Sequence, residues 1–249
     1  MMVRRTRFET TSFALHILAM VCMLCDHLWA TVVPGNEWLT CIGRIAFPIF
    51  AFLIVEGYFH TKSLKKYVRR LLIFAAISEV PFNLMTGGSV FNPTHQNVLW
   101  TFLISVGLIR LIEWARSKPY QVWRWLLTAL GVLLGCTAAL FGMTDYMHFG
   151  VLTVLIFYLF RGRRWWCFLG QLICLAYINL EAVGGVVYPF MLFGREWLLP
   201  QQGFALLALI PIWLYRGKQG FYHKPLKYTY YAFYPIHLLV LYFLMLIFH

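Results

Sequence analysis

The chain has 249 residues, of which 61% are hydrophobic and only 12% are charged, and its formal net charge is +12. This composition, with a mean hydropathy of +0.71, excludes a soluble globular domain and is typical of an integral membrane protein. In such a protein a surplus of Lys and Arg marks the cytoplasmic loops, so we expect no nucleic-acid partner despite the basic charge.

Apolar segments recur along the whole chain, and a helix needs about 20 largely apolar residues to cross a bilayer. We therefore predict an all-α, polytopic integral membrane helix bundle that forms a single transmembrane domain over residues 1–249. Two segments, 147–160 and 202–216, are short, which suggests tilt or cover by neighbouring helices. The nine predicted helices are 13–33, 38–59, 69–86, 97–114, 122–141, 147–160, 165–181, 202–216 and 229–248.

Basic residues fall in alternate connections between these helices, as the positive-inside rule requires. If the amino terminus is cytoplasmic, all Lys and Arg residues except Arg44 and Arg195 lie on the cytoplasmic side. The carboxyl terminus then lies outside. The cytoplasmic clusters are Arg4, Arg5 and Arg7; Lys62, Lys65, Lys66, Arg69 and Arg70; Arg110, Arg116, Lys118 and Arg124; Arg161, Arg163 and Arg164; and Arg216, Lys218, Lys224 and Lys227.

The stretch 182–201 is apolar as far as Phe193 and then becomes mixed. If it crossed the membrane, the basic cluster that starts at Arg216 would move to the outer side. The charge pattern therefore predicts an interfacial or re-entrant segment on the outer side.

Ionisable residues inside apolar helices are costly, and they persist where they face a bundle interior or a watery cavity. Asp26 and His27 lie about two-thirds of the way outward along the first helix, and Arg44 lies near the outer end of the second. Glu56 and His237 are expected nearer the cytoplasmic side. The outer half therefore gathers an acid, a histidine and an arginine, together with Asn97, Thr101, Asp145 and Tyr146 from later helices.

Two interpretations of the first cluster stay open. Asp26 and Arg44 can form a structural ion pair that joins two helices. Alternatively, a histidine of near-neutral pKa can act as a base, and an arginine can stabilise an oxyanion or hold a phosphate. Adjacent helical positions point about 100° apart, so Asp26 and His27 need not touch. Glu56 has its own simple interpretation, a pair with Lys62 or Arg69.

No metal site is predicted, because the histidines are scattered over separate helices without zinc-like spacing. Cys22 and Cys25 resemble a CxxC pair, but both lie within one apolar helix. We interpret them as small buried hydrophobic residues.

An ordered set of motifs resembles the TraX family, membrane proteins whose namesake acetylates the amino terminus of conjugative pilin. The motifs run in order over almost the whole chain. They are Asp26-His27, 43–52 (GRIAFPIFAF), 55–58 (VEGY) with His60-Thr61, 78–83 (SEVPFN), 97–99 (NVL), Asp145-Tyr146 with 150–152 (GVL), and 234–238 (YPIHL).

The resemblance implies a transmembrane acyltransferase-like protein that takes acetyl from cytoplasmic acetyl-CoA. His27 would be the base or acyl carrier, Asp26 would orient it, and Arg44 would bind acetyl-CoA or stabilise the oxyanion. A basic opening on the cytoplasmic side of the bundle would hold acetyl-CoA. Its residues would be Arg44, Glu56, Lys62, Lys66, Arg69, Arg70 and His237. The cavity would be lined by Glu79, Asn83, Asn97, Thr101, Asp145, Tyr146 and Tyr234.

We therefore predict an acetyltransferase of the bacterial cytoplasmic membrane. Its acceptor is an amine or hydroxyl in or across the membrane, on a pilin or other peptide, a cell-surface glycan or a lipid. Its other partners are acetyl-CoA and the membrane lipids. A transporter or flippase for a small anionic substrate remains an alternative, because intramembrane Asp, His and Arg also mark substrate paths. A non-catalytic assembly partner is a third.

Overall fold

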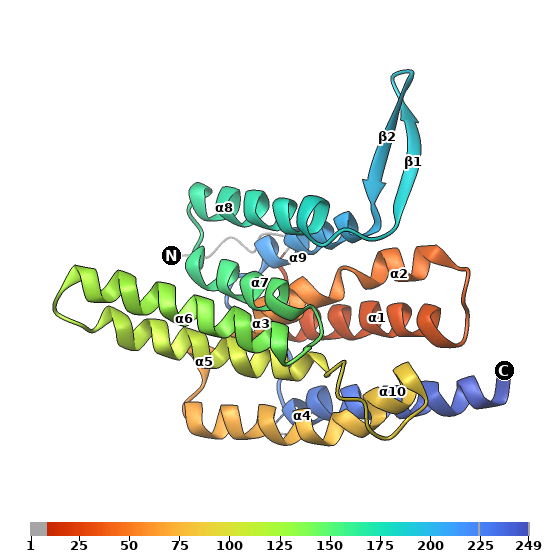
Figure 1. Cartoon of the computed structure of the whole chain (residues 1–249), viewed down its shortest axis with the longest axis horizontal. Helices are drawn as coiled ribbons and strands as arrows, with labels where there is room; N and C mark the ends of the chain where they lie inside the picture. The colour runs from red at the N-terminus through yellow and green to blue at the C-terminus, as the bar shows by residue number, and fades with distance from the viewer. Residues whose placement is uncertain (1–8, 224, 249) are drawn as a thin grey trace.

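The computed structural model describes residues 9–223 and 225–248. Arg4, Arg5, Arg7 and Lys224, which belong to the predicted cytoplasmic clusters, lie outside the described residues. Most described residues are helical, and the helices run side by side along one common direction (Figure 1). The helices are α1 Ser12–Thr31, α2 Glu37–Gly43, α3 Ala46–His60, α4 Leu64–Gly87, α5 Val98–Arg116, α6 Gln121–Phe141, α7 Met147–Leu159, α8 Trp165–Ala176, α9 Leu209–Leu214 and α10 Leu226–Phe248.

Within the described residues, six helical stretches are long and apolar enough to cross a membrane. The count of nine spans is therefore not confirmed. Two further stretches, Met147–Leu159 and Gln201–Leu214, are apolar but shorter. The six stretches are Ser12–Thr31, Glu37–His60, Val98–Arg116, Gln121–Phe141, Trp165–Ala182 and Tyr228–Phe248.

Capping side chains set the ends of two helices that carry predicted site residues. Ser63 accepts a hydrogen bond from the Lys66 backbone N–H, so α4 begins at Leu64, before the predicted start at residue 69. Asn97 caps α5 in the same way, through the Leu99 N–H. The first of these caps brings Lys66, Arg69 and Arg70 onto a helix, where Lys66 and Arg70 share one face.

The predicted second helix is interrupted at Arg44. Helix α2 ends at Gly43, and α3 begins at Ala46 with Pro48 in its first turn, a position that proline tolerates. A Cβ at Gly43 would lie 2.3 Å from Cβ of Asp26. Glycine is therefore what allows α2 to approach α1 so closely, and Arg44 follows directly at the break.

The region 182–201 requires a correction to the all-α prediction. It holds an antiparallel hairpin of β1 (Val187–Leu192) and β2 (Arg195–Pro200). Phe193 and Gly194 form the turn with φ of 53° and 72°, and positive φ at both positions is typical of a type I′ turn. The hairpin projects away from the helix bundle (Figure 1). In β1, Tyr188 and Phe190 alternate with Val187 and Pro189, a period of two that fits a strand.

Irregular helical turns flank the hairpin. Residues Tyr177–Ala182 continue α8 as a π-helix, and Gln201–Ala208 form a 3₁₀-helix that leads into α9. Single π turns occur often at functional sites, because they rotate the following side chains out of the regular register. Here they bring two polar amides into the bundle, as described below.

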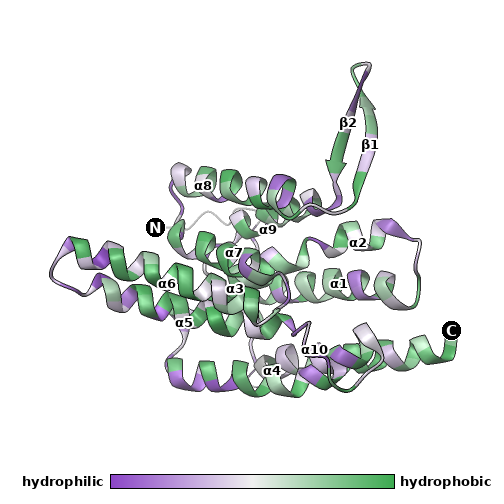
Figure 2. Cartoon of the chain, in the orientation of Figure 1, coloured by the Kyte–Doolittle hydropathy of each residue, from purple (hydrophilic) through white to green (hydrophobic). Residues whose placement is uncertain are grey.

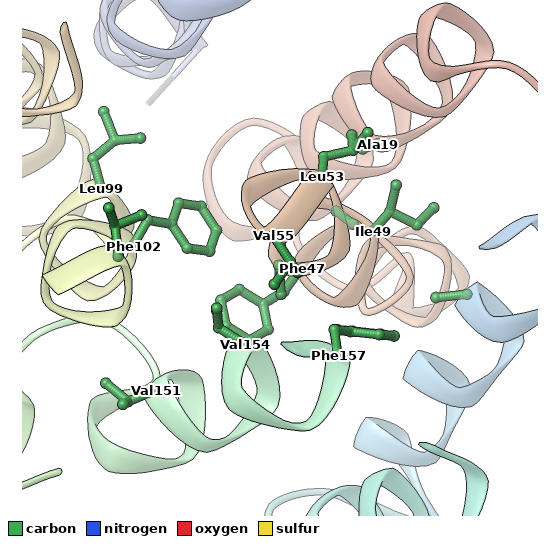
Figure 3. Packing of buried hydrophobic residues seen from close by; sticks show 14 of the residues in the cluster. Ala19, Phe47, Ile49, Leu53, Val55, Leu99, Phe102, Val151, Val154 and Phe157 are labelled. Carbon is green, nitrogen blue, oxygen red and sulfur yellow. The ribbon is translucent and has the colours of Figure 1, made fainter. Parts of the chain in front are cut away.

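Helix α3 lies at the centre of the bundle and contacts α1, α5, α7 and α9. Figure 3 shows Phe47 of α3 beside Val154 of α7, with Phe102 approaching from α5. Ile49 and Val154 are fully buried. This apolar packing fixes the depth of Arg44, just before α3, and therefore the position of the polar centre.

Hydrophilic residues colour both ends of the bundle in Figure 2. One end holds the α5–α6 connection and the start of α4, while the α1–α2 connection lies at the opposite end (Figure 1). We call these the basic end and the opposite end. The described part of the chain thus keeps the predicted segregation of basic residues; which end faces the cytoplasm stays a prediction.

Candidate active site

Two histidines meet inside the bundle, one from each end of the sequence. Nδ1 of His27 on α1 lies 2.8 Å from Nε2 of His237 on α10. The two rings are parallel, with an interplanar angle of 1° and centroids 5.0 Å apart. His237 is buried and also stacks on Phe233. The contact joins residues that are 210 positions apart.

The hydrogen bonds of this pair specify its tautomers. Nδ1 of His237 lies 2.8 Å from the carbonyl oxygen of Phe233, which can only accept, so this Nδ1 carries the proton. Nε2 of His237 is then an acceptor, and the 2.8 Å contact requires Nδ1–H of His27 as its donor. In the neutral pair, His27 is left with an unprotonated Nε2. That arrangement is the one a general base needs, with a second group orienting the ring.

Asp26 points to a different neighbour. Nη2 of Arg44 donates to both carboxylate oxygens of Asp26, and the Thr40 hydroxyl donates to Oδ1 at 2.7 Å. Both side chains of the ion pair are less than one-fifth exposed, at 19% and 18%. The structural ion pair allowed by the sequence is therefore present, and it joins α1 to the α2–α3 break.

Two amides that the sequence analysis missed extend this pair. Nη1 of Arg44 approaches Oε1 of Gln202 at 3.4 Å, and Nε2 of Gln202 donates to Oδ1 of Asn179 at 3.0 Å. Asn179 in turn donates to the Leu175 carbonyl. Gln202 and Asn179 are both buried. Polar amides in apolar helices were the available signal, but the tertiary structure brings Gln202 to Arg44 and Asn179 to Gln202.

Tyr146 lies beside this centre in a strained conformation. Its φ is 59°, in the left-handed region, and its ring stacks on Phe47 with centroids 3.9 Å apart. A Cβ at Gly150 would lie 2.6 Å from Thr101 and 3.0 Å from Tyr146, so glycine is required there. Strained non-glycine residues of this kind often mark functional sites.

Asp145 is held by contacts with Thr101 and His95. The Thr101 hydroxyl donates to the Asp145 backbone carbonyl at 2.6 Å, and the Asp145 carboxylate lies 3.6 Å from Nε2 of His95. His95 is in the α4–α5 connection, and the adjacent Asp145 carboxylate raises its pKa above the ordinary value. Sequence reasoning did not select His95, because it stands outside the apolar runs.

Glu79 and Asn97 form a neighbouring polar cluster between α4 and α5. Oε2 of Glu79 accepts from Nδ2 of Asn97 and from the indole N–H of Trp100, the latter at 2.8 Å. Asn97 also donates to the Ala75 carbonyl, whereas Asn83 reaches the Val90 carbonyl at 3.3 Å. These residues cross-link helix ends; their predicted place in a substrate cavity stays a prediction.

A cavity of about 950 Å³ opens on the basic side of the histidine pair. Its deep part reaches Met23, one helical turn before His27, and Tyr234, whose ring centroid is 5.7 Å from that of His237. Its mouth combines cations with aromatic rings. The residues that form this mouth are His60, Lys62, Lys66, Arg70, Phe221, Tyr222, Tyr230 and Tyr231.

Of the residues predicted to hold acetyl-CoA, Glu56, Lys62, Lys66 and Arg70 line this cavity. Arg44, Arg69 and His237 are not among its lining residues in the described chain. The suggested partners of Glu56 were wrong: it pairs with Arg161, with Oε1 2.8 Å from Nε, and lies 3.7 Å from His60.

The predicted depth of His237 also requires correction. It was expected nearer the cytoplasmic side, apart from His27, but the two rings touch. The cause is that α10 packs against α4 and α1, which brings His237 to the depth of His27. Asp26 and Arg44 are brought together as an ion pair, and Tyr234 lines the cavity.

Together the fold and the site define a membrane helix bundle with a histidine pair, an ion pair and a basic cavity. The TraX protein family matches residues 12–245, and the chain belongs to this family. It is 24% identical over 258 residues to a protein of Dichelobacter nodosus named "Probable fimbrial assembly protein FimC, serogroup H1". That alignment covers 94% of this chain and 95% of the relative. No solved structure matches the chain.

Proposed function

We propose that this protein is a membrane-embedded acetyltransferase that moves an acetyl group from acetyl-CoA to an amine or hydroxyl acceptor. The observation that carries the proposal is the histidine pair, which lies one helical turn beyond the deep end of a basic, aromatic-lined cavity. Membership of a family associated with pilin acetylation, and a relative named for fimbrial assembly, support the same conclusion.

The large cavity fits a phosphorylated nucleotide donor. Its volume of about 950 Å³ lies at the upper end of ordinary ligand pockets, which span roughly 300–1,000 Å³. Lys62, Lys66 and Arg70 at its mouth suit phosphates, and the aromatic rings there offer faces on which a base can stack. Bound acetyl-CoA would supply the thioester, and the same cavity reaches Tyr234, whose ring centroid lies 5.7 Å from that of His237.

His27 then acts as the general base. Its Nε2 takes the proton of the attacking acceptor as the new bond to the acetyl carbon forms, and it returns that proton to sulfur as the carbon–sulfur bond breaks. His237 accepts the Nδ1–H of His27 throughout, which fixes the ring and stabilises its charged form. His237 is therefore a positioning residue, a role different from the acetyl-CoA contact predicted for it.

Arg44 and Asp26 hold the base in place. Nη2 of Arg44 is occupied by Asp26 and Nη1 faces Gln202, so the pair locks α1 to the α2–α3 break beside His27. We assign both as positioning residues in this state. An oxyanion role for Arg44 would require Nη1 to exchange Gln202 for the substrate oxygen.

The charge of the opposite end favours an amine acceptor, such as a peptide amino terminus. Apart from Arg44, Arg195 is the only Lys or Arg expected there, whereas Glu37, Glu79 and Asp145 contribute carboxylates. Such a surface attracts an ammonium group. A neutral glycan hydroxyl carries no charge and would not be attracted by these carboxylates.

The test is acetyl-CoA binding and CoA release with the full-length protein in nanodiscs. We expect the wild type to bind acetyl-CoA and to release CoA when a peptide amine is added. His27→Ala should retain binding but lose release by about 10²–10⁴-fold, the range of general-base catalysis. His148→Ala, at another histidine of the opposite end, is the matched control and should behave as wild type. Absence of acetyl-CoA binding by folded wild-type protein would refute the proposal and direct attention to transport assays.

A further inference from the structure

A second, smaller cavity lies at the basic end, outside the histidine centre. Its volume is about 270 Å³, and it is formed where α3, α8 and α9 meet the α7–α8 connection. Glu56, Tyr215 and Gly217 line both cavities, so the two adjoin. We call the smaller one the arginine slot, because Arg161, Arg163 and Arg216 line it.

The wall of the slot is apolar and firmly held. Phe168 and Trp213 pack with ring centroids 5.3 Å apart. The indole N–H of Trp213 donates to Oε1 of Gln171 at 2.8 Å, and Nε2 of Gln171 donates to the Phe160 carbonyl at 3.0 Å. Both polar atoms of the Gln171 side chain are therefore occupied by hydrogen bonds within the protein. A ligand in the slot would contact aromatic and aliphatic side chains at this wall.

The charges at the rim are not balanced. Arg161 is neutralised by Glu56 and lies over the ring of Phe59, 4.2 Å from its centroid. Arg163 donates to the Tyr215 carbonyl at 2.7 Å but meets no carboxylate within the described chain. Arg216 has no ion pair or hydrogen bond from its side chain to any described residue. Two guanidinium groups that share one small cavity repel each other unless an anion lies between them.

We propose that the arginine slot binds the headgroup phosphate of an anionic phospholipid from the surrounding bilayer. Arg163 and Arg216 hold the phosphate, and Phe168, Ile212 and Trp213 contact the glycerol and the first part of an acyl chain. The combination of a basic rim with an apolar wall favours a lipid over a free phosphate, because a free phosphate has no apolar part to contact the wall. The basic end is where the positive-inside rule places the anionic cytoplasmic leaflet. This inference does not depend on the proposed acetyl transfer.

The experiment titrates full-length protein in a neutral detergent with phosphatidylglycerol and counts bound lipids by native mass spectrometry. Phosphatidylcholine and soluble glycerol 3-phosphate are the comparison ligands. We expect the Arg163→Gln/Arg216→Gln variant to bind phosphatidylglycerol about tenfold more weakly than wild type, in line with the loss of two cationic contacts. Lys118→Gln/Arg124→Gln, in the α5–α6 region of the same end, removes the same charge and should bind like wild type.

Three outcomes would overturn the inference. Equal loss in the control variant would mean that the attraction is spread over the basic end. Equal binding of glycerol 3-phosphate would mean a plain phosphate site. Weaker acetyl-CoA binding by the Arg163→Gln/Arg216→Gln variant, with unchanged lipid binding, would mean that the slot is part of the acetyl-CoA site. If Arg163→Gln disturbs folding through the lost bond to Tyr215, the single Arg216→Gln variant, which breaks no described contact, should still weaken phosphatidylglycerol binding several-fold.

Discussion

Asp26 and His27 are neighbours in the sequence, yet each serves a different partner. Asp26 is held by Arg44 and Thr40, while His27 turns to His237. The helix itself predicts this separation, because adjacent positions point about 100° apart. What the sequence leaves undetermined at this scale is which distant residue each side chain meets.

The ion pair gives the first residue-scale prediction. Asp26→Asn leaves the mostly buried guanidinium of Arg44 without its counter-charge, and we expect a loss of about 3 kcal/mol in stability. Thermal unfolding in detergent measures it. The double variant Asp26→Asn/Arg44→Gln removes both charges. Its loss of stability should be clearly smaller than the sum of the losses in the two single variants. Purely additive losses would show that the two side chains are not coupled.

His95 gives a pH-dependent prediction. The adjacent Asp145 carboxylate raises the pKa of His95 in the folded protein, so protonated His95 stabilises the fold. This contribution is fully present below the unfolded pKa of about 6.5 and is lost as the pH rises through the higher folded pKa. Thermal unfolding followed from pH 5 to pH 8.5 should show this loss. His95→Gln should flatten that part of the profile, and an unchanged profile in the variant would contradict the assignment.

At the scale of elements, close helix contacts rather than hydrophobic pattern position the site. The apolar runs predict where helices lie, and the observed helices follow those runs closely. They do not predict the break at Arg44 or the π turn at Tyr177–Ala182, because both depend on contacts with other helices. The hairpin of β1 and β2 was missed because its length and hydrophobicity also suit an interfacial segment.

Gly43 tests the importance of the α1–α2 approach. In Gly43→Ala the new Cβ would lie 2.3 Å from Cβ of Asp26, so α2 must move and the ion pair must distort. We expect a loss of about 1–3 kcal/mol, as for other overpacked sites, with acetyl transfer reduced in parallel. Gly107→Ala, where nothing lies within 4 Å of the new Cβ, is the matched helical control and should be neutral or slightly stabilising. Similar melting temperatures for both variants would contradict this account.

For the whole molecule, the segregation of charge between the two ends predicts the orientation in the membrane. The α5–α6 and α7–α8 connections are at the basic end, whereas the α1–α2 and α4–α5 connections are at the opposite end (Figure 1). From the positive-inside rule we expect the basic end to face the cytoplasm. The same arrangement would open the large cavity toward cytoplasmic acetyl-CoA and place Asp145 and Glu79 toward the acceptor.

Cysteine labelling in intact cells checks this orientation. In a background without the six native cysteines, Ser89→Cys should react with a membrane-impermeant maleimide, whereas Ser117→Cys should react only after permeabilisation. Ser89 and Ser117 are both exposed, so accessibility of the side chain does not limit either reaction. The reverse pattern would invert the topology and, with it, the side from which the cavity is filled.

The sequence by itself determined the class of protein, the positions of most helices and the membership of the TraX family, because hydropathy, charge segregation and ordered motifs are local properties of the chain. It also selected His27, Asp26, Arg44 and Tyr146 as candidates. Only the tertiary structure decided that His237 joins His27 and that Gln202 and Asn179 support Arg44. The physical reason is that the depth and rotation of each helix are set by its packing partners, and no local pattern along one helix specifies those partners.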